Sequence, residues 1–197
     1  MIKAIIFDIG GILYTGKRED FYNKLQTLLN IEDNKLTNLI EKHFDNLLLG
    51  KKSFFDLADD LKISKKDFRT KAKKAWLEVF IVKEEMINLI NKLRKKYTIA
   101  CLSNAVDFDV MMDKETKVVN LFDVYINSCD TKSRKPEKKI YQITLDQLNI
   151  KAEECIFIDD REKYLPTARK MGIKVIHFKK IKQLKEELVE LGTTLKY

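Results

Sequence analysis

The feature that most constrains the fold is an apolar segment near the start of the chain that ends in a carboxylate and two glycines. Five of the six residues from Ile2 to Phe7 are apolar, which is typical of a strand covered on both faces in a parallel sheet. Asp8 follows this strand, and Gly10 and Gly11 permit a tight turn after it. Because open α/β sheets bind ligands at the carboxyl ends of their strands, Asp8 is a candidate functional residue. The alternative is that its carboxylate only stabilises a turn.

From residue 83 onward, predicted helices and strands alternate. Apolar runs predict the strands, and apolar residues at helical spacing predict the helices. Such alternation indicates parallel strands joined by right-handed crossovers, so we expect a doubly wound, Rossmann-like α/β core. The predicted strands are 97–102, 124–126, 155–158 and 174–176, and the predicted helices are 84–95, 114–120, 137–148, 164–170 and 181–191.

The segment that follows the first strand has the apolar spacing of helices and no strand pattern. Ser53 and Ser64 are typical helix N-caps, and Gly50 fits the end of a helix. This pattern predicts a helical subdomain inserted into the α/β core. The predicted division is a helical cap at 16–81 and a core domain formed by 1–15 and 82–197.

The balance of charges bears on the class of partner. The chain has 197 residues, with 38 Lys and Arg against 30 Asp and Glu, so its formal net charge is +8. The lysines are interleaved with acids along the predicted helices, which is typical of a solvated surface and argues against a nucleic-acid partner. A mild positive field also suits a small anionic substrate.

The apolar runs and the cysteines bear on localisation. No apolar run approaches the ~20 residues of a membrane span, and the first strand leaves no room for a signal peptide after Met1. The three cysteines lack metal-ligand spacing, and both Cys101 and Cys155 lie in apolar strand patterns typical of buried thiols. We therefore expect a cytoplasmic protein without a membrane partner. No feature of the sequence indicates an oligomeric state.

Polar residues recur next to the later predicted elements. Ser103 and Asn104 follow the second strand, Lys135 precedes a helix, and Asp159 and Asp160 follow a later strand. With the carboxylate after the first strand, these residue types suit phosphoryl transfer. A carboxylate can attack phosphorus while a hydroxyl, backbone N–H groups and a lysine hold the phosphate oxygens. Paired carboxylates also suit Mg²⁺, which prefers oxygen ligands.

In these residues the chain resembles the haloacid dehalogenase-like hydrolase superfamily, and the resemblance covers its whole length. The segment 7–13, Phe-Asp-Ile-Gly-Gly-Ile-Leu, is similar to the first family motif, and 102–104 is similar to the second. Lys135 with the following proline looks like the third motif, and 157–161 looks like the fourth. The helical insertion resembles the C1-type cap of subfamily I.

The resemblance implies catalytic and substrate-binding roles for several residues. Asp8 would be the nucleophile that receives the phosphoryl group. Ser103 and Asn104 would contact the phosphate, and Gly11 would belong to the turn that binds it. Lys135 would stabilise the phosphoryl group.

The resemblance also implies a set of metal ligands. Mg²⁺ would be held by Asp8, by the backbone carbonyl of Gly10 and by Asp160. Asp159 would lie nearer to Lys135, although the two adjacent aspartates could exchange these roles.

Two positions depart from the family pattern. Family phosphatases usually have an aspartate at the position of Gly10, where it acts as general acid and base, an effect typically worth ~10²–10⁴ in rate. The resulting Asp-x-Gly-Gly motif is similar to that of some sugar-phosphatase-like members and of phosphatase domains joined to epoxide hydrolases. Tyr164 stands where an asparagine supports the metal site, so we expect that support to be weakened or rearranged.

Several functions fit these observations. The first is a Mg²⁺-dependent phosphatase that hydrolyses a small phosphorylated metabolite, a sugar phosphate or a nucleotide, slowly because of Gly10. The alternative is a catalytically degenerate relative that binds phosphate or a protein partner. A haloacid dehalogenase ranks lower because the Asp159-Asp160 pair favours a metal. A response-regulator receiver also ranks lower, because its acid pair follows its first strand and it has no long helical insertion.

Overall fold

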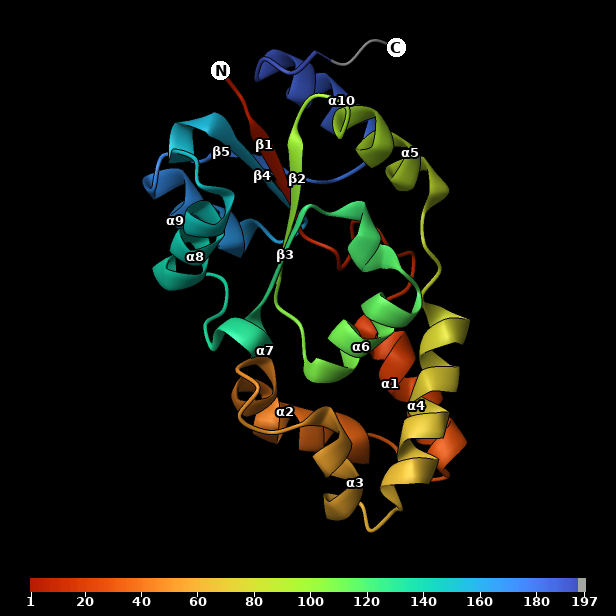
Figure 1. The fold of residues 1–197 in the computed structure, drawn as a ribbon. Helices are drawn as coiled ribbons and strands as arrows, with labels where there is room; N and C mark the ends of the chain where they lie inside the picture. Colours follow the sequence, from red (N-terminus) through yellow and green to blue (C-terminus); the bar gives the residue numbers. More distant parts are fainter. Residues whose placement is uncertain (195–197) are drawn as a thin grey trace.

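The computed structural model describes residues 1–194 and contains a five-stranded sheet in the order β3-β2-β1-β4-β5 (Figure 1). Every pair of neighbouring strands is parallel, which confirms the predicted Rossmann-like sheet. The strand that begins the chain lies at the centre, with a paired strand on each side. The strands are Ala4–Phe7 (β1), Thr98–Ser103 (β2), Val124–Asn127 (β3), Cys155–Asp159 (β4) and Lys174–His177 (β5).

The strands alternate with helices after residue 83, as the pattern predicts. The α-helices there are Glu84–Leu93 (α5), Asp107–Glu115 (α6), Ser128–Thr131 (α7), Lys138–Leu148 (α8), Leu165–Lys170 (α9) and Ile181–Glu190 (α10). Short 3-10 helices are Val118–Leu121 (η2), Ala152–Glu154 (η3) and Glu162–Tyr164 (η4).

Helices cover both faces of the sheet, which explains the continuous apolar pattern of β1. Ile5 and Phe7 belong to the apolar cluster that includes α5 and α10, on one face. Ala4 and Ile6 belong to the cluster that includes α8 and α9, on the other face. Figure 1 shows these two pairs of helices on opposite sides of the strands. Side chains of β1 are therefore buried whichever face of the sheet they point to.

The prediction of one helix at 114–120 is wrong. Helix α6 begins seven residues earlier, at Asp107, and a separate turn, η2, follows it. The start was missed because Val106 precedes the helix in place of a usual capping residue, and Asp109 accepts from the Val106 N–H instead (3.1 Å). The break was missed because the left-handed residue between α6 and η2 is Lys117 (φ 62°), where glycine or asparagine is usual.

Residues 16–81 form helices and no strand. They are Arg18–Leu29 (α1), Lys35–Leu48 (α2), Phe54–Asp56 (η1), Leu57–Asp60 (α3) and Lys65–Val79 (α4). Both predicted serine caps are confirmed, because Ser53 accepts from the Phe55 N–H and Ser64 accepts from the Asp67 N–H, each at 3.1 Å. The division of the chain into a core and a cap stays a prediction.

The two segments that connect these helices to the sheet, residues 13–16 and 79–83, lie side by side. The N–H of Thr15 donates to the carbonyl of Ile81 (3.0 Å), and the N–H of Lys83 donates to the carbonyl of Leu13 (2.8 Å). A Cβ at Gly16 would overlap the carbonyl oxygen of Val79, so the two segments can approach only because residue 16 is glycine.

Helix α6 joins the helical segment to the sheet (Figure 1). The ring of Phe108 in α6 stacks on those of Phe21 and Phe54, with centroids 5.7 and 5.0 Å away. Arg18 donates two hydrogen bonds to the Asp109 carboxylate, at 3.2 and 2.9 Å. The apolar cluster on the α5 side of the sheet is therefore continuous with the interior of α1–α4.

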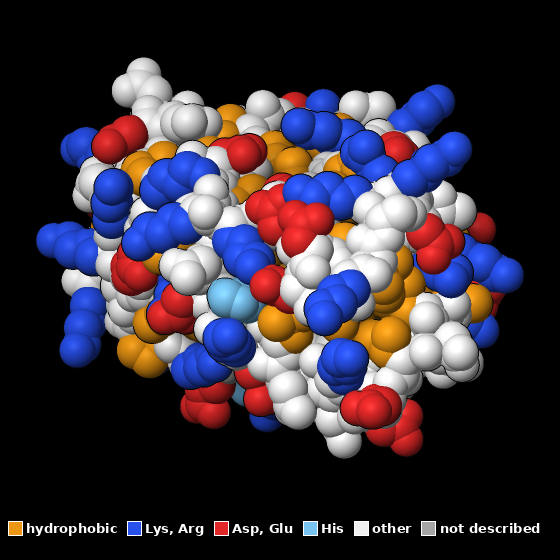
Figure 2. Space-filling model, turned by 90° about the horizontal axis from the view of Figure 1, so that it is seen from below, with side chains coloured by type: hydrophobic (Ala, Val, Ile, Leu, Met, Phe, Trp, Pro, Cys, Tyr) orange, Lys and Arg blue, Asp and Glu red, His pale blue; other side chains and the backbone are white. Residues whose placement is uncertain are grey.

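The surface of α2–α4 carries both signs of charge. Figure 2 views the molecule from the end that these helices form, and acidic and basic side chains are intermixed there. Lys52 pairs with Asp60 at 2.6 Å, and Lys65 pairs with Asp56 at 2.7 Å. Among the residues that the structure describes, no helix combines the length and apolar character needed to cross a membrane.

Candidate active site

The polar residues predicted from the strand ends lie together at the carboxyl edge of the sheet. Asp8 directly follows β1, and its N–H donates to the carbonyl of Ile158 in β4 (2.9 Å). Ser103 and Asp159 are the last residues of β2 and β4, the two strands that flank β1. Parallel pairing therefore brings residues about 95 and 150 positions apart in sequence onto one edge.

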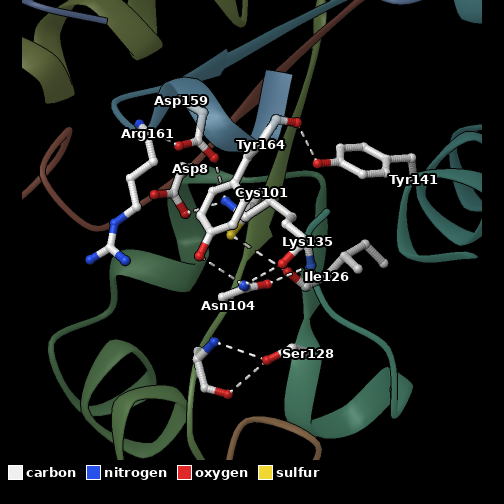
Figure 3. A network of polar contacts seen from close by, with 11 residues as sticks. Asp8, Cys101, Asn104, Ile126, Ser128, Lys135, Tyr141, Asp159, Arg161 and Tyr164 are labelled. Atoms are coloured by element: carbon white, nitrogen blue, oxygen red, sulfur yellow. Dashed lines mark hydrogen bonds and ion pairs between the residues drawn. The ribbon is translucent and has the colours of Figure 1, made fainter. Parts of the chain in front are cut away.

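Lys135 reaches this edge from the connection between α7 and α8. Its ammonium lies 2.9 Å from Asp8 Oδ1 and 2.6 Å from Asp159 Oδ2 (Figure 3). The Lys135 side chain is 1% exposed, and that of Asp159 is fully buried. A buried ammonium thus links the two carboxylates that follow β1 and end β4.

The charges of these groups perturb one another. Burial, followed by the neighbouring charge of Asp8, raises the pKa of Asp159 to about 7, although Lys135 opposes the rise. Burial and Asp8 also raise the pKa of Asp160. Burial disfavours the Lys135 ammonium, but the Asp8 and Asp159 carboxylates outweigh it and raise the pKa of Lys135. Among the described residues, Lys135 pairs with Asp8 and Asp159 only, so the three carboxylates carry more charge than this one paired cation.

The carboxylates of Asp8, Asp159 and Asp160 could hold a metal ion. Each offers an oxygen, and these oxygens lie within 4.8 Å of one another. Asp160 Oδ1 is buried, and no described residue gives it a hydrogen bond. Buried polar atoms normally have a partner, so this oxygen fits a ligand of a bound cation. Oxygen ligands with an excess of negative charge suit Mg²⁺.

The two glycines after Asp8 differ in what they permit. Gly11 has a φ of +72°, and a Cβ there would overlap Asp160 Oδ2 and lie 2.7 Å from Asp160 Cγ. Gly11 thus lets the Asp160 carboxylate approach the turn. At Gly10 the nearest atom to a Cβ is Asp8 Oδ2, at 3.9 Å, so a Cβ would have room there. The carbonyl of Gly11 accepts from Lys83 Nζ (2.9 Å), a contact that the sequence did not indicate.

Asn104 holds the backbone of Lys135. Its Oδ1 accepts from the Lys135 N–H (2.8 Å), and its Nδ2 donates to the Lys135 carbonyl (3.0 Å). The side-chain amide thus bonds to the backbone of Lys135, and the contact of Asn104 with phosphate stays a prediction. Ser103, beside it, is buried at the end of β2. Its contact with phosphate stays a prediction.

Tyr164 lies against Lys135. The centre of its ring is 5.1 Å from Lys135 Nζ, and the ring of Phe157 lies 5.4 Å from the same atom. The Tyr164 hydroxyl accepts from Asn104 Nδ2 at 3.4 Å, and its carbonyl accepts from the Tyr141 hydroxyl at 2.6 Å (Figure 3). The sequence indicated only that a phenol replaces an amide; this position of the ring depends on the loop that carries it.

A model of the haloacid dehalogenase-like hydrolases matches residues 2–172. Among solved structures, the chain resembles a HAD family enzyme from Bacteroides thetaiotaomicron in complex with magnesium and inorganic phosphate. The TM-score is 0.76 at 25% identity, covering 91% of this chain and 95% of that one. A HAD-like family hydrolase from Porphyromonas gingivalis shares the fold, with a TM-score of 0.75 at 23% identity, covering 95% and 98%.

Curated relatives match part of the chain. Bifunctional epoxide hydrolase 2 from Rattus norvegicus is 32% identical over 101 residues, which are 48% of this chain and 18% of that protein. The Mus musculus protein of the same name is 44% identical over 55 residues, which are 28% of this chain and 10% of that protein. The chain thus spans less than a fifth of the length of these relatives.

Proposed function

Because the chain belongs to the haloacid dehalogenase-like hydrolase family, we propose that it is a Mg²⁺-dependent phosphatase acting on a small organic phosphate. The observation that carries the proposal is the buried pairing of Lys135 with both Asp8 and Asp159 beside the unpartnered oxygen of Asp160. A sugar phosphate or a nucleotide is the proposed class of substrate. The structural relative bound to magnesium and inorganic phosphate supports a magnesium site and a phosphate site, without indicating the alcohol part of the substrate.

Asp8 is the proposed nucleophile. Its carboxylate attacks phosphorus, so a bond forms between Asp8 and phosphorus while the ester P–O bond breaks and the alcohol leaves. Water then attacks the aspartyl-phosphate and releases inorganic phosphate, which regenerates the carboxylate. Lys135 offsets the charge of Asp8 and of the phosphoryl oxygens, and the Ser103 hydroxyl and the Asn104 N–H donate to those oxygens.

The proposed metal ligands are Asp8, Asp160 and the carbonyl of Gly10. Bound Mg²⁺ would reduce the repulsion between the attacking carboxylate and the phosphate. The pairing of Asp159 with Lys135 and the free Oδ1 of Asp160 support Asp160 as the direct ligand. Gly11 supports this role by leaving room for the Asp160 carboxylate.

Gly10 predicts slow turnover. It has no side chain to protonate the leaving alcohol or to deprotonate the attacking water, and such help is typically worth ~10²–10⁴ in rate. The helices of residues 16–81 are the proposed cap. Their contacts with α6, which begins just after Asn104, hold them near the carboxyl edge of the sheet, where a cap would cover Asp8 and exclude water.

A panel of phosphorylated metabolites with Mg²⁺ tests this function. We expect phosphate release from at least one sugar phosphate or nucleotide, and loss of that release in Asp8→Asn. Asp146→Asn is the matched control and should leave the rate unchanged, because Asp146 is an exposed residue of α8 whose carboxylate accepts a hydrogen bond from Gln142. Full activity of Asp8→Asn would contradict the mechanism.

Gly10 and Tyr164 also favour a second candidate, a catalytically degenerate protein that binds phosphate or a protein partner. Crystals grown with Mg²⁺ and beryllofluoride distinguish the two. An ordered adduct on Asp8 supports the phosphatase, whereas the lack of an adduct on Asp8 supports the degenerate protein. Chloride release from a haloacid would instead show a dehalogenase.

A further inference from the structure

We propose that Tyr164 is a positioning residue for Lys135, and that with Phe157 it forms an aromatic cage around the Lys135 ammonium. This inference rests on the proposed function, in which Lys135 holds phosphoryl oxygens. It assigns a role to the residue that departs from the family pattern. The name aromatic cage refers to the rings of Phe157 and Tyr164 throughout.

In the aromatic cage, the centres of two rings lie close to the buried ammonium of Lys135. Lys135 Nζ lies 5.1 Å from the centre of the Tyr164 ring and 5.4 Å from that of Phe157. Both distances are within the ~6 Å at which the face of an aromatic ring attracts a cation. The attraction is strongest where water is excluded, and the Lys135 side chain is 1% exposed.

Tyr164 is itself fixed at two points. Its carbonyl accepts from the hydroxyl of Tyr141, which lies in α8 and whose ring packs edge-on against Phe157, with centroids 5.7 Å apart. Its own hydroxyl accepts from Asn104, and the same Asn104 amide holds the backbone of Lys135. Asn104 and the aromatic cage therefore hold opposite ends of the flexible lysine side chain.

An aromatic face suits this lysine better than another polar group does. An ammonium has three N–H donors, and the carboxylates of Asp8 and Asp159 lie where they accept two of them. A ring attracts the cation without offering a lone pair, so the third donor stays available for a phosphoryl oxygen. An amide at position 164 could accept that third bond and turn the ammonium away from the phosphate.

Variants at position 164 separate positioning from simple packing. Tyr164→Phe keeps the ring, Tyr164→Leu removes it, and Tyr164→Asn places the amide of the family pattern there. Phe122→Leu removes a buried ring that packs on Tyr125, away from the cage, and is the control for loss of packing. All four are compared as full chains, with kcat corrected for the fraction folded.

We expect Tyr164→Phe to keep kcat within about threefold of wild type, since the ring supplies the attraction. Tyr164→Leu and Tyr164→Asn should lose about 30-fold in kcat at saturating Mg²⁺, with KM changed much less. Phe122→Leu should lower the melting temperature and leave kcat unchanged. Wild-type kcat in Tyr164→Leu, or a higher kcat in Tyr164→Asn, would overturn the proposal.

A readout that needs no turnover is the NMR signal of the Lys135 side-chain Cε–Hε group, identified by its absence from Lys135→Arg. The rings should shift this signal upfield in wild type and in Tyr164→Phe, and Tyr164→Leu should reverse part of that shift. If wild type releases no phosphate from the panel, the proposed function fails and this signal alone decides the cage. A signal that does not move in Tyr164→Leu overturns it.

Discussion

Replacing Lys135 with methionine should destabilise the fold strongly, because two buried carboxylates lose their counter-charge. The ammonium lies 2.9 Å from Asp8 and 2.6 Å from Asp159, and methionine has a similar volume without the charge. Removing one partner of a buried ion pair typically costs ~3–5 kcal/mol. For a chain of this size each kcal/mol lowers the melting temperature by about 2–4 °C, so a loss of about 4 kcal/mol corresponds to roughly 8–16 °C.

The size of this loss depends on pH. Burial and Asp8 raise the pKa of Asp159 to about 7 against the opposing effect of Lys135, so removing Lys135 raises it further. The folded state of the variant then binds this proton more tightly than the unfolded state, whose carboxyl has a pKa of 3.8. Its stability therefore increases as the pH falls below the raised pKa. The loss relative to wild type should be largest at about pH 8 and smaller at about pH 5.

Urea unfolding followed by circular dichroism at both pH values measures the effect. Lys3→Met is the control, because Lys3 is 59% exposed and pairs with Glu154 at 2.7 Å, a surface contact worth at most ~1 kcal/mol. Adding Asp159→Asn to Lys135→Met should recover part of the stability, since it removes one buried charge. Equal losses for the two methionine variants, or a loss that does not vary with pH, would refute the reasoning.

Three further predictions follow from single positions. Gly11→Ala should weaken Mg²⁺ binding by at least ~10-fold in calorimetry, because its Cβ overlaps Asp160. Gly192→Ala is the control for backbone strain, because Gly192 has a φ of +94° and no atom of a described residue lies within 4 Å of the added Cβ. This control should leave Mg²⁺ binding unchanged. A Cβ has room at Gly10, so Gly10→Asp should raise kcat by about 10²-fold, and an unchanged rate would show that the missing acid does not limit turnover. Burial raises the pKa of Asp113 from 3.8 to about 6, so the folded state holds this proton more tightly. Wild-type stability relative to Asp113→Asn should therefore fall by about 2 kcal/mol between about pH 4 and pH 7, and a flat difference in urea unfolding would contradict this.

The sheet could be predicted because each strand has its own local pattern. The apolar run of β1 follows from its burial on both faces, and the polar residues at strand ends follow from parallel pairing. Asp8, Ser103 and Asp159 were therefore brought to one edge by topology alone. The start of α6 could not be predicted in this way, because Val106 gives no capping signal and Asp109 completes the turn from inside the helix.

The contacts of Asn104 and Tyr164 with Lys135 could not be predicted for a different reason. Asn104 and Tyr164 are separated by 60 positions, and their meeting depends on how two loops pack after the sheet has formed. Residue type indicated what each side chain can do, but it did not indicate that the Asn104 side chain holds the backbone of Lys135; the contact of Asn104 with phosphate stays a prediction. Local patterns carry no information on which of several polar partners a loop residue reaches.

The two glycines after β1 place opposite constraints on the chemistry. Gly11 suits its φ of +72°, and a Cβ there would displace the Asp160 carboxylate. At Gly10 a Cβ would have no described atom closer than 3.9 Å, so the space beside the backbone does not require glycine there. In the proposed reaction the leaving oxygen must then take its proton from the substrate or from water. The cost of doing so falls as the leaving alcohol becomes more acidic, because a stable alkoxide needs less help. Esters of acidic alcohols are therefore the substrates for which the lack of a side chain at Gly10 matters least.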